Sequence, residues 1–122
     1  MPTTAENLAR WHQHLKDHNH QTLWDMLHPD CVFESPVVHT PQVGRPIVFK
    51  YLASAGEVLG GEGFTYVGEW VNERSAILEF TNVVRGIKVN GIDMISWDED
   101  GLITHFKVMV RPLKAINLMH QM

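Results

Sequence analysis

An aspartate stands in the middle of an apolar segment, NGIDMISWDEDG, at residues 90–101. The residues around Asp93 are mostly of the types that a buried strand contains, whereas a carboxyl group is not. Burial among apolar side chains disfavours the charged form of a carboxyl group and raises its pKa. Such a group can act as a general acid or base near neutral pH, so Asp93 is the candidate catalytic residue.

Two other interpretations of Asp93 stay open at this level. The carboxyl group can be structural, hydrogen-bonded to the backbone or to the indole of Trp11. The strand can also be exposed at this position, in which case an aspartate requires no special explanation.

Histidines are the second group of residues that could do chemistry. His39 follows the first predicted strand and could supply a base near the mouth of a cavity, although an exposed loop histidine is the more common case. The run HQHLKDHNH places His14 and His18 four residues apart, a helical spacing that can hold a metal. No third ligand is evident, and both lie largely off the apolar stripe of the helix. A solvated helix face, and no metal site, is therefore the prediction.

The composition predicts one globular domain over residues 1–122, with 44% hydrophobic and 20% charged residues. The formal charge of −4 gives no reason to expect nucleic acid or an anionic membrane as a partner. The start, MPTTAENLAR, has neither the basic nor the apolar part of a signal peptide, and no apolar run has membrane-spanning length. A lone cysteine, Cys31, excludes an internal disulfide and is typical of a reducing compartment. We therefore expect a cytoplasmic protein.

Three helices are predicted before most of the strands. Thr3 and Glu6 form a capping-box pattern, and apolar residues at helical spacing follow, which predicts a helix over 4–18. The patterns further along predict helices over 22–28 and from Arg45 to about residue 59, and strands over 31–35, 64–71, 75–84, 87–97 and 102–111.

Short turns separate the last four predicted strands, so these strands must be antiparallel neighbours in a meander. Helices first and a meander afterwards predict an α+β fold. We expect a cone-shaped α+β barrel, in which three N-terminal helices pack in a strongly curved, mostly antiparallel sheet made of a short first strand and the four-strand meander.

Alternation along the strands predicts which residues face the helices. Asp93 shares one face of its strand with Val89, Gly91, Ile95 and Trp97. On the neighbouring strands the corresponding inner sets are Ala76, Leu78, Phe80 and Asn82, and Leu102, Phe106, Val108 and Val110. Asp93 is therefore predicted to point into the cone.

The opposite face of the sheet is predicted to be the interface of a homodimer. It carries Ile77, Val83, Ile92, Met94 and Met109 among Glu79, Lys107 and Arg111. A surface with this many apolar side chains is unfavourable in open water over a large area. Packing against the same face of a second copy, with two-fold symmetry, would cover it.

The chain resembles the nuclear transport factor 2-like superfamily, which includes ketosteroid isomerases, scytalone dehydratases and the SnoaL-like polyketide cyclases. The order of elements is similar over nearly the whole chain, and the most specific segments are LHPDCVFESP…GRPIVFKYL and GIDMISWDEDGLITHFKVMVRP. The second segment is similar to uncharacterised SnoaL-like proteins.

The resemblance to ketosteroid isomerases extends to individual residues. Ile92-Asp93, with a turn glycine eight residues later at Gly101, matches the position of their oxyanion-hole acid. Ser35, in Glu34-Ser35-Pro36, stands where their general base is found, and ungapped counting places Trp11 at the position of their hydrogen-bonding tyrosine. The base is therefore missing from its usual place, which argues against steroid isomerisation by that mechanism.

The resemblance implies a small cavity enzyme without a cofactor. It would carry out isomerisation, cyclisation or dehydration by acid–base chemistry on an apolar small molecule with a carbonyl group. Asp93 would be catalytic, and the expected ligand-binding residues are Trp11, Phe33, Ser35, His39, Tyr51, Phe80, Ile95, Trp97, Phe106 and Val108. The alternative is a non-catalytic module of the same fold that binds a hydrophobic ligand or serves association, because fold does not fix function.

Overall fold

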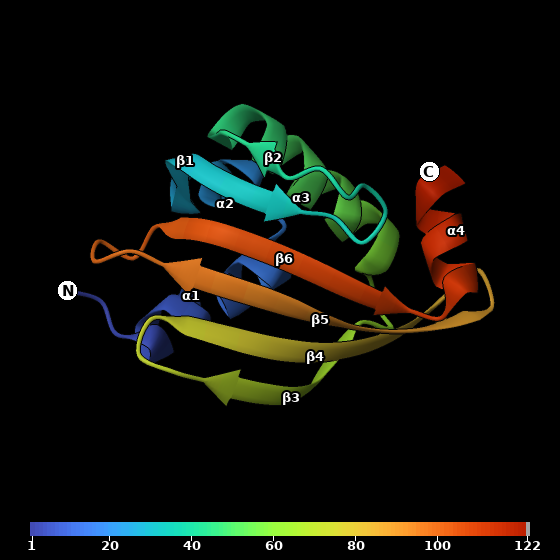
Figure 1. Ribbon diagram of the computed structural model, residues 1–122. Coiled ribbons are helices and arrows are strands. Elements are labelled where there is room, and N and C mark those ends of the chain that lie inside the picture. The colour runs from blue at the N-terminus through green and yellow to red at the C-terminus, as the bar shows by residue number, and fades with distance from the viewer. Residues whose placement is uncertain (122) are drawn as a thin grey trace.

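The computed structural model of the protein describes residues 1–121 (Figure 1). Its helices are α1 (Thr4–Asp17), α2 (His20–Met26), α3 (Arg45–Leu59) and α4 (Leu113–Gln121). Its strands are β1 (Leu27–Glu34), β2 (Gln42–Val43), β3 (Thr65–Val71), β4 (Ser75–Val84), β5 (Ile87–Trp97) and β6 (Ile103–Arg111).

The strands form one mixed sheet in the order β2-β1-β6-β5-β4-β3. The meander from β3 to β6 is antiparallel, as predicted. The first strand pairs with β6 in parallel, so the chain crosses from β1 over α3 to the far edge of the sheet before the meander begins. The expected α+β fold with a curved, mostly antiparallel sheet is confirmed.

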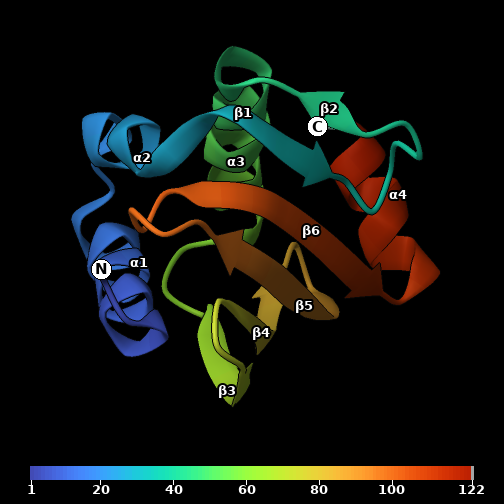
Figure 2. The ribbon, with the colours of Figure 1, turned by 60° about the vertical axis from the view of Figure 1, so that its left-hand side comes forward.

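Helices α1, α2 and α3 cover one face of the sheet, and α4 lies at the end of the molecule where β6 finishes (Figures 1 and 2). The apolar core lies between these helices and the sheet. Its most deeply buried large side chains are Phe80, Phe106, Leu23, Leu27, Leu78, Ile95 and Ile103. Within the described residues, no helix has the length and apolar character required to cross a bilayer.

The first helix begins at the predicted capping box. The Thr3 hydroxyl accepts a hydrogen bond from the backbone N–H of Glu6 at 3.1 Å, and the Glu6 carboxylate accepts one from the Thr3 N–H at 3.2 Å. These bonds satisfy backbone donors that the first turn leaves free. The helix buries Leu8 and Trp11 against the sheet and ends in a left-handed residue, His18.

The predicted inner faces of β4 and β5 are confirmed. The buried residues are Ala76, Leu78, Phe80 and Asn82 on β4, and Val89, Gly91, Asp93, Ile95 and Trp97 on β5. The prediction for the start of β6 was wrong. A bulge there sets Ser96 opposite His105 but Trp97 opposite Ile103, so Ile103 is buried in place of Leu102. One extra residue in a strand reverses the alternation beyond it.

The boundaries around the first strand also differ from the prediction. The second helix ends at Met26, and the strand begins at Leu27 and not at Cys31. Pro29 suggested a break, but it lies where the pairing of β1 with β6 is irregular, between Leu27 and Val32. A proline is tolerated there because its missing N–H removes no hydrogen bond of the ladder.

Two elements were not predicted. Strand β2 pairs with β1 over only two residues, too few to give a sequence pattern. Helix α4 buries Ala115 and Leu118. Their spacing of three residues, just after Pro112, was a helical signal. The segment is so short that its pattern is also compatible with an irregular tail.

Gly91 provides a test of how tightly the inner face of the sheet is packed. A Cβ at this position would lie 2.5 Å from Cζ of Phe80 and 2.6 Å from the backbone oxygen of Met109. We expect Gly91→Ala to lower the free energy of unfolding by about 1–3 kcal/mol, because the backbone cannot move aside without breaking the ladder.

Gly56→Ala in α3 is the matched control, because a Cβ there meets nothing within 4 Å. Alanine in a helix should raise the free energy of unfolding by roughly 0.5–1 kcal/mol. Urea unfolding of the two variants measures both changes, and equal effects of the two substitutions would contradict this account of Gly91 packing.

Candidate functional site

Three side chains from separate elements form a chain of hydrogen bonds. The Trp11 indole N–H donates to the Tyr66 hydroxyl at 3.0 Å, and the Tyr66 hydroxyl donates to Oδ2 of Asp93 at 2.6 Å. The tyrosine uses its oxygen as acceptor and its hydrogen as donor, so it links the indole to the carboxyl group. The chain ends at Oδ2 of Asp93.

Each member of this chain is held by regular structure. Asp93 lies on β5, in the interior of the sheet, with Leu78 of β4 and Val108 of β6 as its register partners. Tyr66 lies on β3 opposite Phe80. Trp11 projects from the buried face of α1. Because the elements are packed around these side chains, the hydroxyl and the carboxyl group are already in place before a ligand binds.

Asp93 is 7% exposed, and burial raises its pKa to about 7. The hydrogen bond from Tyr66 acts in the opposite direction, because it stabilises the carboxylate. Burial also raises the pKa of Tyr66 far above its ordinary value, and the nearby Asp93 charge adds to that. Tyr66 therefore remains a proton donor, while Asp93 can be neutral or ionised near pH 7.

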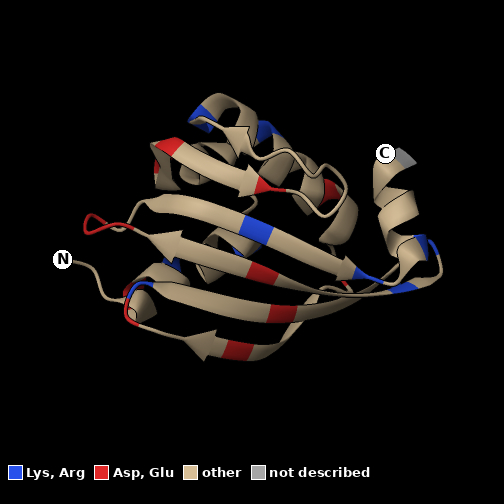
Figure 3. Ribbon diagram, viewed as in Figure 1, with Lys and Arg blue, Asp and Glu red and all other residues tan. Residues whose placement is uncertain are grey.

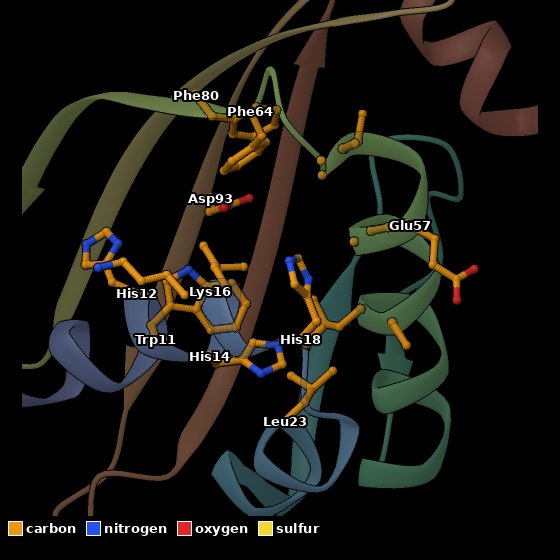
Figure 4. A pocket seen from close by; sticks show the side chains of 18 of the residues that line it. Trp11, His12, His14, Lys16, His18, Leu23, Glu57, Phe64, Phe80 and Asp93 are labelled. Carbon is orange, nitrogen blue, oxygen red and sulfur yellow. The ribbon is translucent and has the colours of Figure 1, made fainter.

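Asp93 and Tyr66 line a cavity of about 590 Å³ between α1, α3 and the sheet. Figure 4 shows Asp93 on the sheet side, near Phe64 and Phe80, facing residues of α1. The aromatic residues that line the cavity are Trp11, Phe64, Tyr66, Phe80 and Phe106. Trp11 packs against Phe106 with ring centroids 5.2 Å apart, and Phe64 stacks on Phe80 at 5.1 Å. The polar chain thus opens into an apolar space that suits a flat ligand.

The mouth of this cavity carries polar residues from three helices. His12, Lys16 and His18 come from α1 and its cap, His20 from α2, and Glu57 from α3. In Figure 4 the Glu57 carboxylate points away from Asp93. Apart from the hydrogen-bonded chain and the buried His14, the other residues that line the cavity are apolar.

The structure brings some of the predicted site residues together and separates others. Trp11, Phe80, Phe106 and Val108 line the same cavity as Asp93. Phe33, Ser35 and Tyr51, again with Val108, line a second cavity of about 480 Å³ between the end of β1, α3 and α4. Ile95, Trp97 and His39 line neither of these cavities.

Ser35 has a structural role in its turn. Its hydroxyl accepts hydrogen bonds from the backbone N–H groups of Val37 at 3.0 Å and Val38 at 3.4 Å. This stabilises the bend after β1. Ser35 therefore lies outside the cavity that holds Asp93, so the two positions compared with the isomerases do not share a cavity here.

Three other predicted ligand contacts have different positions in the fold. His39 is exposed on the loop after β1. Ile95 and Trp97 face inward as expected, but they are core residues, 1% and 5% exposed. They follow Asp93 along β5 on the same face, and alternation alone could not tell a cavity wall from filled core.

The prediction that His14 is solvated was wrong. The side chain is 8% exposed and packs against Trp11, with ring centroids 5.6 Å apart. His18 ends α1 in the left-handed conformation, and its backbone N–H still donates to the His14 carbonyl at 2.9 Å. Within residues 1–121, no group of three or more His, Cys, Asp or Glu side chains is arranged to hold a metal ion.

Tyr66 is the functional candidate that sequence reasoning missed. A signal was present, because pairing the strand over 65–71 with β4 sets a tyrosine opposite Phe80. A bulge between Tyr66 and Gly68 breaks the alternation within that strand, however. The sequence therefore could not predict which face of the sheet the Tyr66 side chain lies on.

Comparison with known proteins identifies a family. The family model described as a SnoaL-like domain matches residues 8–106. A crystal structure of a steroid delta-isomerase from Pseudomonas aeruginosa is 38% identical, with a TM-score of 0.89, over 96% of this chain and 85% of that chain. No curated protein matches the chain.

Two further structures are similar. An uncharacterized bacterial protein from Silicibacter pomeroyi, described as having a cystatin-like fold, is 26% identical over 94% of this chain and 80% of that chain, with a TM-score of 0.85. A putative SnoaL-like polyketide cyclase from Shewanella denitrificans is 15% identical, with a TM-score of 0.69 and 96% of each chain covered. At this low identity, the cyclase supports the fold alone.

The raised pKa of Asp93 predicts a specific dependence of stability on pH. Its ordinary value is 3.8 and its value in the folded protein is about 7, so the folded state binds more protons between these limits. The free energy of unfolding should therefore fall as the pH rises from about 4 to about 7, by about 1.4 kcal/mol per unit of pKa difference.

Asp93→Asn removes this ionisation, and comparing it with the wild type cancels contributions from other groups. Urea unfolding across this pH range should show a difference between the two proteins that grows with pH and levels off above about 7. Carboxyl ¹³C NMR gives the pKa directly. A pH-independent difference, or an ordinary acidic pKa, would contradict the prediction.

Proposed function

The chain belongs to the SnoaL-like domain family, and we propose that it is an enzyme of isomerase, cyclase or dehydratase type. Its substrate is an apolar small molecule with a carbonyl group, bound in the cavity that contains Asp93. Asp93 is the general acid and base. Side chains alone can transfer the protons, so the proposed chemistry requires no metal or organic cofactor.

The observation that carries this proposal is the buried carboxyl group at the end of the Trp11–Tyr66–Asp93 chain, facing an apolar cavity. A purely structural aspartate would have both oxygens satisfied by the protein. Here Tyr66 engages one oxygen, and a pKa near 7 allows both protonation states at neutral pH. These are the properties of a group that takes up and returns a proton.

The proposed reaction begins with the ionised form of Asp93. The carboxylate takes a proton from the carbon next to the ligand carbonyl, and the electrons of the C–H bond form an enolate. The neutral acid then returns the proton to another carbon, or to the oxygen, of the same ligand. Tyr66 holds the carboxyl group through Oδ2 in both states, so the same acid serves both steps without net consumption of protons.

The similarity to a steroid delta-isomerase supports isomerase chemistry for this chain. The proton transfer proposed for Asp93 fits its position on β5, in the wall of the cavity. The proposed reaction uses Asp93 as its single acid–base group. Ser35, at the position compared with the isomerase base, lines the other cavity.

A second candidate function is a binding module without catalysis. The apolar character of the cavity favours it, because a hydrophobic ligand can be held there without any proton transfer. In that case Asp93 and Tyr66 would only orient a polar group of the ligand.

Binding and proton exchange together separate the two candidates. The enolate mimic 2-naphthol should bind the wild type and shift the pKa of Asp93, measured by ¹³C NMR. The protein should also accelerate the exchange of the α-protons of 2-tetralone in D₂O. Asp93→Asn should slow this exchange by at least about 100-fold, because an amide can hydrogen-bond but cannot transfer the proton.

His39→Gln is the control, because His39 is exposed and lines neither cavity. This variant should match the wild type in both measurements. Binding of 2-naphthol without any acceleration of exchange would favour the binding module. Absence of both, with an ordinary pKa for Asp93, would refute the proposal.

We further propose that the protein forms a homodimer through the outer face of the sheet. Trp70, Ile77, Ile92, Met94 and Met109 lie on neighbouring strands, and Trp70 and Met109 are 57% and 50% exposed. Charged residues are sparse along the strands and gather in the turns (Figure 3). On this face Glu79 and Lys107 carry opposite charges, which a two-fold pairing can bring together across the interface.

Sedimentation equilibrium at micromolar concentration tests the dimer. The wild type should sediment as a dimer, and Met109→Glu should weaken association by at least about tenfold, because it buries a charge in the interface. Val43→Glu, at a 67% exposed position on β2, should leave the dimer intact. A monomeric wild type would refute this part of the proposal.

A further inference from the structure

The opening of the cavity that contains Asp93 is lined mainly by basic side chains. Its exposed titratable residues are Lys16, His18, His20 and Glu57, and the half-exposed His12 adjoins them. Their exposure separates them from the buried residues of the cavity wall, so they mark the place where the cavity meets solvent. In Figure 4 His12 lies to the left, His18 lies to the right, and Asp93 lies above both.

Lys16 lies about one helical turn away from the hydrogen-bonded chain. The ring of His12 packs edge-on against Tyr66, with ring centroids 5.5 Å apart, so His12 marks the part of α1 nearest that tyrosine. Lys16 follows His12 by four residues on the same edge of the helix, about 6 Å further along the axis. This distance is comparable to the length of a fused two-ring molecule.

No neighbouring carboxylate neutralises the ammonium group of Lys16. Among residues 1–121, Lys16 forms no ion pair with an acidic side chain. The carboxylate of Asp17, the next residue, accepts a hydrogen bond from the Gln13 amide at 2.9 Å. The carboxylate of Glu57 points away from Asp93 in Figure 4. Lys16 is therefore available to a negatively charged group of a ligand.

The two ends of the cavity favour different ligand groups. A cation beside apolar walls attracts an anion more strongly than it would in open water, because the low dielectric of the walls focuses its field. At the other end, the carboxyl group of Asp93 would repel an anion whenever it is ionised. A ligand with one charged and one uncharged polar group would therefore place the uncharged group at Asp93 and the charged group at the opening.

We propose that Lys16 binds an anionic group of the ligand at the opening of the cavity, and that the ligand is an apolar carbonyl compound with a carboxylate at the end away from the carbonyl. A single ammonium group matches the single charge of a carboxylate. His18 and His20 have ring N–H groups that can donate further hydrogen bonds at the same opening. This inference rests on the proposed function, because the carbonyl end of the ligand occupies the site at Asp93.

Ligand pairs that differ only in charge test this anchor. Isothermal titration calorimetry at low ionic strength would compare 6-hydroxy-2-naphthoate and 7-hydroxy-2-naphthoate, each with its own amide. The hydroxyl group mimics the enolate at Asp93, and the amide has nearly the size of the carboxylate without its charge. The wild type should bind at least one carboxylate about fivefold more tightly than its amide. High salt should reduce this advantage to below about twofold, because an ion pair at an exposed opening is screened.

Charge reversal at two exposed helical lysines separates a local from a general effect. Lys16→Glu should reverse the preference, so that the amide binds more tightly than the carboxylate. Lys114→Glu changes the net charge equally, at an exposed position of α4 that lines neither cavity, and should keep the full advantage. Lys16→Gln repeats the measurement if the reversed variant does not fold, as judged by thermal melting, and should lower the advantage to below about twofold.

Each outcome either supports or refutes the anchor. An advantage of the carboxylate that Lys16→Glu reverses and Lys114→Glu keeps supports it. If the amides bind and the carboxylates bind no more tightly, or if the two lysine variants behave alike, the anchor is refuted and the proposed function stands. If none of the four compounds binds, the anchor is refuted, and the exchange of 2-tetralone protons decides the proposed function separately.

Discussion

The burial of one carboxyl group in the concave face of a sheet is the constraint on which the site of this protein depends. A charged carboxylate at that depth is unfavourable, so Asp93 requires a donor, and Tyr66 of β3 provides it across β4. The tyrosine in turn accepts a hydrogen bond from Trp11, which ties α1 to the sheet at this point. Packing of the helix, direction of the tyrosine and protonation of the carboxyl group are therefore coupled.

The same constraint explains the character of the cavity. Aromatic side chains around the polar chain contribute to the burial of Asp93, which keeps its pKa high and strengthens its hydrogen bonds. On the other side of the indole, His14 stays neutral for the same reason. Burial thus shifts the two pKa values in opposite directions, because it disfavours the charged form of each group.

The fold also limits the comparison with isomerases. Ser35 and Asp93 stand at positions that cooperate in ketosteroid isomerases, but here they line different cavities, and the serine hydroxyl is used by the turn after β1. Similarity of fold and sequence to a steroid delta-isomerase therefore does not place these two positions in one cavity of this chain.

The sequence by itself determined the α+β class, the antiparallel meander and the inward direction of Asp93, because alternation and turn residues are local signals. It did not determine the direction of Tyr66 or of Leu102, because bulges in β3 and β6 reverse the alternation and arise only from strand pairing. Tertiary structure likewise decided which aromatic residues line the cavity and which fill the core. It also turned His14 from a residue of an apparently solvated helix face into a buried one, because other parts of the chain cover that side chain only after folding.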